Sequence, residues 1–255
     1  MAEGNHAQAM LQIAHMATRA RRQDLLAAFV QQHGWTVQAG LFAGMVLPSR
    51  ACWGDGDLLP KLLGCYEAEL HEALTSFVET KPGLIVNVGA AEGYYAVGLA
   101  RLLPGAFAHA FDSADAAADI CREAARLNGV EARLSIVGTC TPELLQLLLP
   151  HASNPLLVRD CEGYERDLLD PRKVPALAGA TIVAECHDFI DALITRTLAE
   201  QLGASHELYA VREGARDPSI SAFLQPFNSL DRWIAVCEYR PCMMHWLVAR
   251  PKVAA

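Results

Sequence analysis

The sequence predicts a doubly wound α/β fold built on a mainly parallel sheet. From Gly83 onward, short apolar runs alternate with segments whose apolar residues recur at helical spacing. Strands and helices that alternate at this size form parallel sheets with right-handed connections. A glycine-rich turn follows the first apolar run, and acidic residues follow later runs, which is where such sheets bind their ligands.

Seven strands are predicted, the last two of them antiparallel. Strands are expected at 84–88, 106–111, 132–137, 155–159, 181–184, 233–239 and 243–249, and helices at 94–103, 114–128, 142–149 and 190–202. Thr141 is placed as the N-cap of the third of these helices. Only Arg240, Pro241 and Cys242 separate the last two strands, and so short a connection predicts an antiparallel C-terminal hairpin.

The first third of the chain does not show this alternation of strands and helices. Apolar residues at helical spacing predict a helix over 6–32, and Gly34 stands where it would end. A short hairpin is expected over 35–47, followed by helical residues 58–80 with a break near Gly64. We therefore expect two regions: a helical and hairpin extension over 1–80, acting as a cap or as the interface of a homodimer, and a ligand-binding domain over 81–255.

Composition restricts the class of partner. The chain has 52% apolar and 20% charged residues, and its 21 basic and 29 acidic residues give a formal charge of −8. This balance favours a small-molecule enzyme and disfavours nucleic acid, whose phosphates need a basic surface. The polar N-terminus lacks a signal peptide, and no run of 18 apolar residues occurs. We expect a cytoplasmic protein with no membrane partner.

The most informative motif is the turn after the first strand, where residues 86–95 read VNVGAAEGYY. Its pattern is GxxxG rather than the GxGxxG of dinucleotide sites. Ala91 replaces the glycine that admits a pyrophosphate, and the carboxylate of Glu92 would repel that group. S-adenosylmethionine (SAM) carries an ammonium and a sulfonium but no phosphate. The turn therefore favours SAM over NAD.

Asp112 supports the same cofactor. It ends the second strand, 23 residues after Gly89. An acid at this position of a doubly wound fold can accept hydrogen bonds from the hydroxyls of an adenosine ribose. The ordered set of strand, glycine turn, helix, strand and acid is more specific than GxxxG alone. It argues against a NAD-dependent dehydrogenase.

Two segments resemble the FkbM-type methyltransferases. The segment from Asn87 to Tyr95 is similar to that family's D-x-G-A-x-x-G-Y-Y turn, and 159–165, RDCEGYE, is similar to its D-x-E-G-x-E segment. Asn87 departs from the usual acid, and Asp112-Ser113 departs from the usual Glu-Pro. The resemblance implies a Rossmann-like class I methyltransferase fold and methyl transfer from SAM, mostly to hydroxyls of natural products or sugars. It implies a cofactor site formed by Tyr66, Glu67, Asn87, Gly89, Ala90, Glu92, Gly93, Tyr94, Asp112, Ser113, Gly138, Thr139 and Asp160. Tyr66 and Glu67 are expected to close over the methionine end, and Gly138 and Thr139 to lie beside the adenine.

Titratable side chains follow the fourth and fifth strands: Asp160, Glu162, Glu185, His187 and Asp188. In a parallel sheet these strand ends face the same crevice as the glycine turn. Two catalytic arrangements suit them. Asp160, Glu185 and Asp188 could hold Mg²⁺ or another divalent cation that acidifies an acceptor hydroxyl. Alternatively His187 could be the general base, oriented by Asp160 or Glu185.

The function predicted from these features is SAM-dependent O-methylation of a small molecule. Two alternatives remain at this point. One is an N-methyltransferase acting on a small amine, because an amine needs less help from a metal. The other is a non-catalytic module that keeps the fold and the cofactor pocket but transfers no methyl group.

Overall fold

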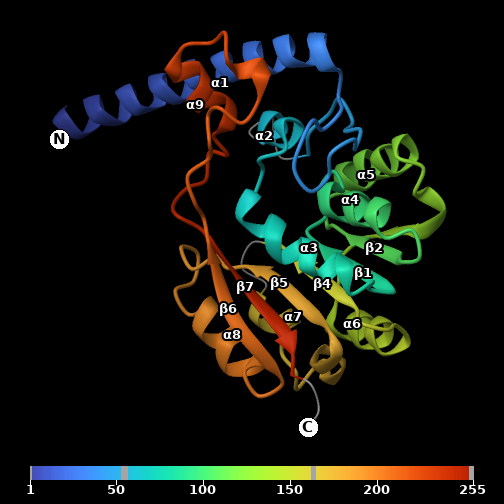
Figure 1. Ribbon diagram of the computed structural model, residues 1–255. Coiled ribbons are helices and arrows are strands. Elements are labelled where there is room, and N and C mark those ends of the chain that lie inside the picture. Colours follow the sequence, from blue (N-terminus) through green and yellow to red (C-terminus); the bar gives the residue numbers. More distant parts are fainter. Residues whose placement is uncertain (1, 53–56, 162–164, 253–255) are drawn as a thin grey trace. The chain divides into compact units, whose positions relative to one another are not determined.

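A computed structural model describes residues 2–52, 57–161 and 165–252. The chain divides into two compact units, each built from separate segments of the sequence (Figure 1). The helical unit comprises Met1–Gly44, Trp53–Ala68 and Ala215–Tyr239. The sheet unit comprises Met45–Cys52, Glu69–Gly214 and Arg240–Ala255.

The sheet unit contains a seven-stranded sheet in the order β3-β2-β1-β4-β5-β7-β6. Its strands are β1 (Leu84–Val88), β2 (Phe107–Phe111), β3 (Leu134–Val137), β4 (Leu156–Arg159), β5 (Thr181–Glu185), β6 (His206–Arg212) and β7 (His245–Pro251). Strands β1 to β5 pair in parallel, whereas β7 is antiparallel to both β5 and β6. The predicted mainly parallel sheet of seven strands is confirmed.

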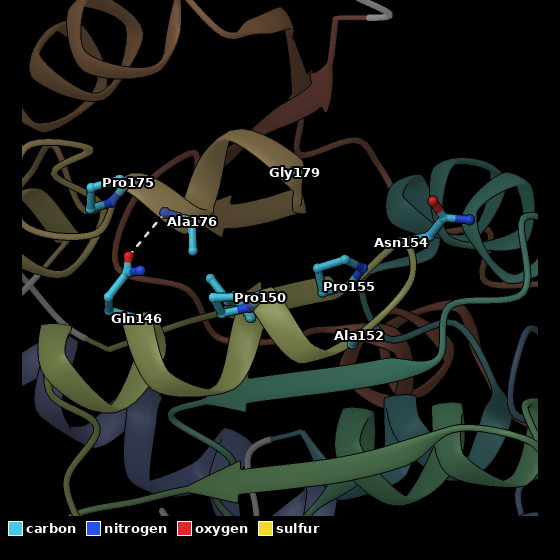
Figure 2. Close-up of a pocket in the computed structure, with 9 residues that line it drawn as sticks. Gln146, Pro150, Ala152, Asn154, Pro155, Pro175, Ala176 and Gly179 are labelled. Atoms are coloured by element: carbon cyan, nitrogen blue, oxygen red, sulfur yellow. Dashed lines mark hydrogen bonds between the residues drawn. The ribbon is translucent and has the colours of Figure 1, made fainter.

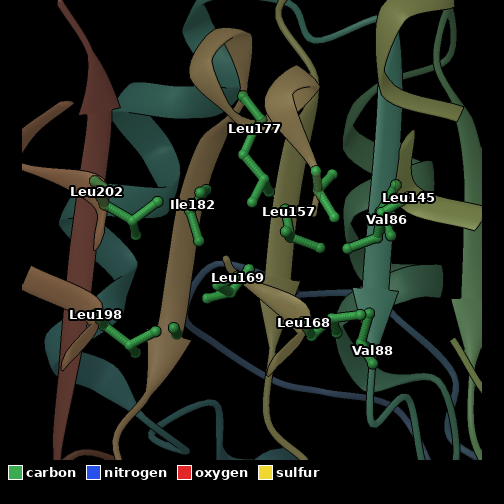
Figure 3. Close-up of a cluster of buried hydrophobic side chains, with 14 of the residues drawn as sticks. Val86, Val88, Leu145, Leu157, Leu168, Leu169, Leu177, Ile182, Leu198 and Leu202 are labelled. Atoms are coloured by element: carbon green, nitrogen blue, oxygen red, sulfur yellow. The ribbon is translucent and has the colours of Figure 1, made fainter. Parts of the chain in front are cut away.

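Helices cover both faces of this sheet. They are α3 (His71–Glu79), α4 (Tyr94–Leu102), α5 (Asp115–Leu127), α6 (Pro142–Leu148), α7 (Glu165–Leu168) and α8 (Ile194–Leu202). Figure 3 shows Leu145 of α6, Leu168 of α7 and Leu198 of α8 packed against Val86, Leu157 and Ile182 of the strands. Right-handed connections place α4 and α5 on the other face, because β1, β2 and β3 progress across the sheet in the opposite direction to β4 and β5.

The predicted C-terminal hairpin over 233–249 is wrong in one of its strands. Residues 229–236 form helix α9 (Ser229–Val236), whose N-cap Asn228 accepts a hydrogen bond from the Asp231 N–H. Strand β7 pairs antiparallel with β5 and, on its other side, with β6, a strand that the sequence did not reveal. Side chains of β6 are mostly exposed or half-buried, so this edge strand lacks the apolar run that marks the inner strands.

The helical unit packs α1 (Ala2–His33), α2 (Leu58–Leu63) and α9 against one another. The hairpin predicted over 35–47 does not form, because these residues contain only isolated bridges and no strand. The Gln38 N–H donates instead to the Leu62 carbonyl at the end of α2. Gly64 ends α2 in the left-handed region (φ +84°), where a Cβ would lie 2.0 Å from the Ala39 carbonyl oxygen.

Five short 3-10 helices complete the described secondary structure: η1 (Ala68–Leu70), η2 (Glu131–Arg133), η3 (Leu149–His151), η4 (Pro175–Gly179) and η5 (Ala222–Leu224). Within the described ranges, none of the helices has the length and apolar character needed to cross a bilayer.

Candidate functional site

The order of the strands reverses between β1 and β4, and ligands of doubly wound folds bind beyond the carboxyl ends of the strands at this point. The two loops that leave these strands lie very close together. The Asp160 N–H donates to the Val88 carbonyl at 2.9 Å, and a Cβ added to Gly89 would lie 1.5 Å from the Asp160 carbonyl oxygen. Gly89 also has a φ of +76°, so the turn tolerates no side chain at this position.

The backbone of the glycine turn is tied to the end of β2. The N–H groups of Gly89 and Ala90 both donate to the Phe111 carbonyl at 2.9 Å, and the Ala91 N–H donates to the Asp112 carboxylate at 2.8 Å. The Gly93 N–H donates to the Ala90 carbonyl at 2.7 Å. These four donors are therefore already engaged. A pyrophosphate bound here would need such N–H groups for itself, so the turn suits a ligand without phosphate.

Ala91 is the strained residue of the turn. Its φ of +47° lies in the left-handed region, which costs a non-glycine residue about 1–2 kcal/mol. The hydrogen bond from its N–H to the Asp112 carboxylate holds it there. Asp112 also accepts from the Ala114 N–H at 2.9 Å, so this half-buried acid organises the turn from the end of β2.

Negative charge gathers beside the turn. Glu92 is buried at 4% exposure, and Asp112 is half-buried. Burial, followed by the neighbouring carboxylates of Glu92 and Asp112, raises the pKa of the Cys121 thiol to about 12. Both acids therefore act on the same small volume behind Gly93, whose Cβ would lie 2.7 Å from Cys121 Sγ. This field favours a cationic ligand.

Asn87 supplies an acceptor that lacks a donor. Its side chain is buried in β1, where the amide nitrogen donates to the Val158 carbonyl at 3.3 Å. Its Oδ1 finds no hydrogen-bond partner among the described residues. Buried acceptors in native proteins are almost always paired, so a ligand with an N–H or O–H donor fits this position. An ammonium group meets that requirement and a phosphate does not. The residues of the turn thus fit SAM.

The other predicted cofactor residues fall into three groups. Ser113, Gly138 and Thr139 are exposed where the chain leaves β2 and β3, and Ala90 and Tyr94 are buried in the turn and at the start of α4. Tyr66 and Glu67 belong to the helical unit. Their predicted place over the methionine end stays a prediction.

Asp160, Glu185 and His187 converge at the ends of β4 and β5. His187 Nε2 lies 3.4 Å from Asp160 Oδ1 and 3.8 Å from Glu185 Oε2. The imidazole and the Glu185 carboxylate are buried, whereas the Asp160 side chain is 45% exposed. Two carboxylates beside one ring nitrogen can orient the imidazole, which a general base requires.

Arg240 also belongs to this cluster, although its sequence position favours a hairpin turn over the acceptor pocket. Its guanidinium forms an ion pair with the Glu185 carboxylate and lies 5.0 Å from the centre of the Trp246 ring. Arg240 was interpreted as part of a hairpin turn, and no local pattern pairs it with a residue 55 positions away. The guanidinium already supplies Glu185 with a cation, and it would repel a divalent ion bound to the same carboxylate.

The sequence predicts that Asp188 binds a metal together with Asp160 and Glu185. In the structure its carboxylate contacts Thr195 instead. Its carboxylate accepts from the Thr195 N–H at 3.0 Å and the Thr195 hydroxyl at 2.7 Å, at the start of α8. His245 Nε2 lies 2.7 Å from the same hydroxyl. The trio whose ligand atoms lie within 4.8 Å of one another is Asp160, Glu185 and His187, among the residues described. Glu162 lies outside the described residues.

A cavity of about 480 Å³ opens at the opposite end of β4 and β5. Figure 2 shows Pro150, Pro155 and Pro175 on its wall, with the Gln146 amide oxygen accepting from the Ala176 N–H. None of its lining residues is titratable, so this cavity offers no acid-base chemistry.

Comparison with known proteins identifies the fold. No family model and no curated protein matches the chain. A protein of Klebsiella pneumoniae assigned as an O-methyltransferase superposes with a TM-score of 0.50 at 15% identity, covering 81% of this chain and 84% of its own. The O-methyltransferase TomG from Streptomyces achromogenes, involved in tomaymycin synthesis and solved with SAM, also gives 0.50, at 14% identity over 86% and 98% of the two chains. The chain therefore has the Rossmann-like class I methyltransferase fold.

Proposed function

We propose that the protein is a SAM-dependent methyltransferase that methylates a hydroxyl of a small molecule. The observation that carries the proposal is the glycine turn, where four N–H groups are engaged within the protein, while the buried Asn87 Oδ1 has no hydrogen-bond partner among the described residues. The fold shared with O-methyltransferases supports it. The motifs at 87–95 and 159–165 support the narrower proposal of an FkbM-type enzyme.

Bound SAM supplies an activated methyl group, so the protein has to hold the acceptor in line and remove its proton. We assign proton removal to His187. The carboxylates of Asp160 and Glu185 stabilise the imidazolium that forms, and Arg240 fixes the Glu185 carboxylate. This assignment needs no metal. Mg²⁺ held by Asp160 and Glu185 is the weaker alternative, because Arg240 competes for Glu185.

Calorimetry with S-adenosylhomocysteine (SAH) tests the cofactor site. The intact chain should bind SAH with micromolar affinity, and Asp112→Ala and Glu92→Arg should each weaken binding at least about tenfold, because they remove or reverse the charge beside the turn. Asp119→Ala, on the exposed side of α5, is the matched control and should bind like the parent. Absence of binding below millimolar SAH would contradict the proposal.

Turnover separates the two catalytic arrangements. His187→Gln should lower the rate of methyl transfer by about 10²–10⁴-fold and leave SAH affinity unchanged. EDTA should leave the parent rate unchanged. A rate that falls with EDTA and returns with Mg²⁺ assigns proton removal to a metal instead. Product analysis distinguishes O- from N-methylation, and SAH binding without turnover on any acceptor would indicate a non-catalytic module.

We also propose that the protein is a homodimer formed through α1. Met10, Leu11, Ile13 and Met16 are each more than half exposed on this helix. Residues 4–18 contain no Asp, Glu, Lys or Arg, so two copies of the helix meet without charge repulsion. Light scattering should give a dimer that Ile13→Glu dissociates, and a monomeric parent would refute the proposal.

A further inference from the structure

The segment that follows His187 presents three large apolar side chains to solvent. Phe189, Ile190 and Leu193 are 50%, 51% and 52% exposed. The Phe189 ring lies 5.7 Å from the imidazole ring of His187, centre to centre. We call Phe189, Ile190 and Leu193 the apolar lip. Single exposed apolar residues are ordinary, but three within five positions beside a catalytic cluster suggest a binding surface.

The backbone holds the lip in place. The Ile190 and Asp191 N–H groups donate to the His187 carbonyl at 2.8 and 3.2 Å, and the Leu193 N–H donates to the Asp191 carboxylate at 3.0 Å. Arg166 forms an ion pair with Asp191 at 2.5 Å. The apolar side chains are thus fixed on a hydrogen-bonded turn, and a ligand that binds them need not order the segment first.

Charge restricts the ligand further. Asp160 and Glu185 face His187, and the Arg240 guanidinium forms an ion pair with Glu185. An acceptor that carries a phosphate or a carboxylate would meet two fixed carboxylates. The charges therefore disfavour an anionic acceptor, and the lip favours an apolar one. A sugar, whose surface is polar, would leave the lip poorly covered.

The acidity of the hydroxyl group distinguishes among neutral acceptors. An aromatic hydroxyl loses its proton near pH 10, as tyrosine does, whereas an aliphatic hydroxyl is far less acidic. A site that removes the proton without a metal is therefore better matched to the aromatic kind. The flat ring of such an acceptor also has the shape to lie against Phe189.

We propose that the acceptor is a neutral aromatic molecule whose ring packs on the apolar lip and whose hydroxyl faces His187. This inference rests on the proposed function and specifies its substrate class. The acceptor oxygen forms a bond to the methyl carbon as the bond from that carbon to the sulfonium sulfur breaks. The hydroxyl proton passes to His187, and SAM becomes SAH.

Four probes test the acceptor class with the full chain and tritiated SAM. Naphthol should be methylated. Naphthylmethanol has the same ring with an aliphatic hydroxyl, hydroxynaphthoate adds a carboxylate, and methyl glucoside is a neutral sugar. Each should show a kcat/KM at least about tenfold below that of naphthol, the factor set by about 1.4 kcal/mol of lost stabilisation. Equal or faster methylation of any of the three overturns the inference.

Substitution tests the lip itself. Phe189→Ser should raise the KM for naphthol about tenfold, because a half-exposed ring contact is removed, and should leave SAH affinity unchanged. Phe107→Ser is the matched control, since Phe107 is also half-exposed but lies at the amino end of β2, away from the strand ends that form the site. Equal effects of the two variants on the KM overturn the role of the lip, as does a change of oligomeric state in Phe189→Ser alone.

Calorimetry separates this inference from the proposed function. A chain that fails to bind SAH overturns both. A chain that binds SAH and methylates methyl glucoside, or none of the aromatic probes, overturns the acceptor class and leaves the cofactor assignment standing.

Discussion

Different interactions stabilise the interior of each of the two units. The sheet unit rests on a continuous apolar cluster, in which Val86, Leu157 and Ile182 from three adjacent strands are fully buried under α6, α7 and α8. The helical unit has an aromatic contact between Phe29 and Phe223 in its core, and ion pairs supplement it. These include Arg21 with Asp231, Lys61 with Asp57 and Arg216 with Glu238.

This difference explains where the candidate site lies. Strand ends of a packed sheet are rigid, so the sheet positions the glycine turn, Asp160 and His187, and hydrogen bonds within the loops add to that support. Ion pairs between segments depend on both partners and on solvent, and they fix orientation more than they add stability. Predictions about the two units therefore differ in size and in their response to pH.

Gly89→Ala should have the largest effect, because it breaks the junction of β1 and β4 inside the site. The new Cβ would overlap the Asp160 carbonyl at a φ of +76°. We expect loss of SAH binding and a fall of more than about 4 kcal/mol in the free energy of unfolding, measured by urea titration. Gly105→Ala, with nothing within 4 Å of its Cβ, should change that energy by less than about 0.5 kcal/mol. Similar results for the two variants would show that the junction can relax.

Leu157→Ala tests the apolar core of the sheet unit. Leu157 is fully buried in β4, so the substitution leaves a cavity and should lower the free energy of unfolding by about 2–5 kcal/mol. Leu147→Ala is its control, since Leu147 is 60% exposed on α6 and should cost less than about 0.5 kcal/mol. A small effect at Leu157 would mean that the sheet unit does not depend on this cluster.

The sheet unit was also the more predictable of the two. Strands β1 to β5 and helices α4, α5 and α6 follow from local periodicity and from short connections, both of which a single sequence displays, whereas the four-residue helix α7 was not predicted. From the same order of elements, the sequence alone predicts that Gly89, Asp112, Asp160 and His187 lie at the carboxyl ends of the strands. Edge strand β6 was not predicted, because its side chains are largely exposed and its sequence therefore lacks the apolar pattern of a buried strand.

The helical unit and the contacts of the site depend on long-range pairing that a sequence does not display. Arg21 meets Asp231 across 210 positions, and Arg240 meets Glu185 across 55. Nothing local indicates either pair. For the same reason Asp188 could be assigned to the strand ends but not to Thr195, which it contacts at the start of α8.

Thr141→Ala probes a local feature that was predicted and is confirmed. The Thr141 hydroxyl accepts from the Leu144 N–H at 3.3 Å and caps α6. Its loss should lower the free energy of unfolding by about 1 kcal/mol in urea titrations. Thr75→Ala is the control, because the Thr75 hydroxyl donates to the His71 carbonyl within α3 and caps nothing. If both substitutions have the same effect, the cap does not stabilise the helix.

Asp231→Asn should have the smallest effect at neutral pH and the clearest dependence on pH. Hydrogen bonds from Arg21 hold the pKa of the Asp231 carboxyl below its usual value of 3.8. A carboxyl whose pKa falls on folding stabilises the protein above its unfolded pKa, and that stabilisation disappears as the pH falls through the folded value.

The difference in unfolding free energy between the parent and Asp231→Asn should therefore be constant from pH 7 to about 5 and shrink below about pH 4. The effect should be smaller than that of Leu157→Ala, because the Arg21 side chain is 42% exposed and water screens the pair. Urea titrations at a series of pH values measure this difference. Asp24→Asn is the control, since Asp24 is 72% exposed and lies 3.5 Å from the same arginine. A difference that persists unchanged below pH 4 would mean that Asp231 acts through its cap contacts with Asn228 and not through its charge.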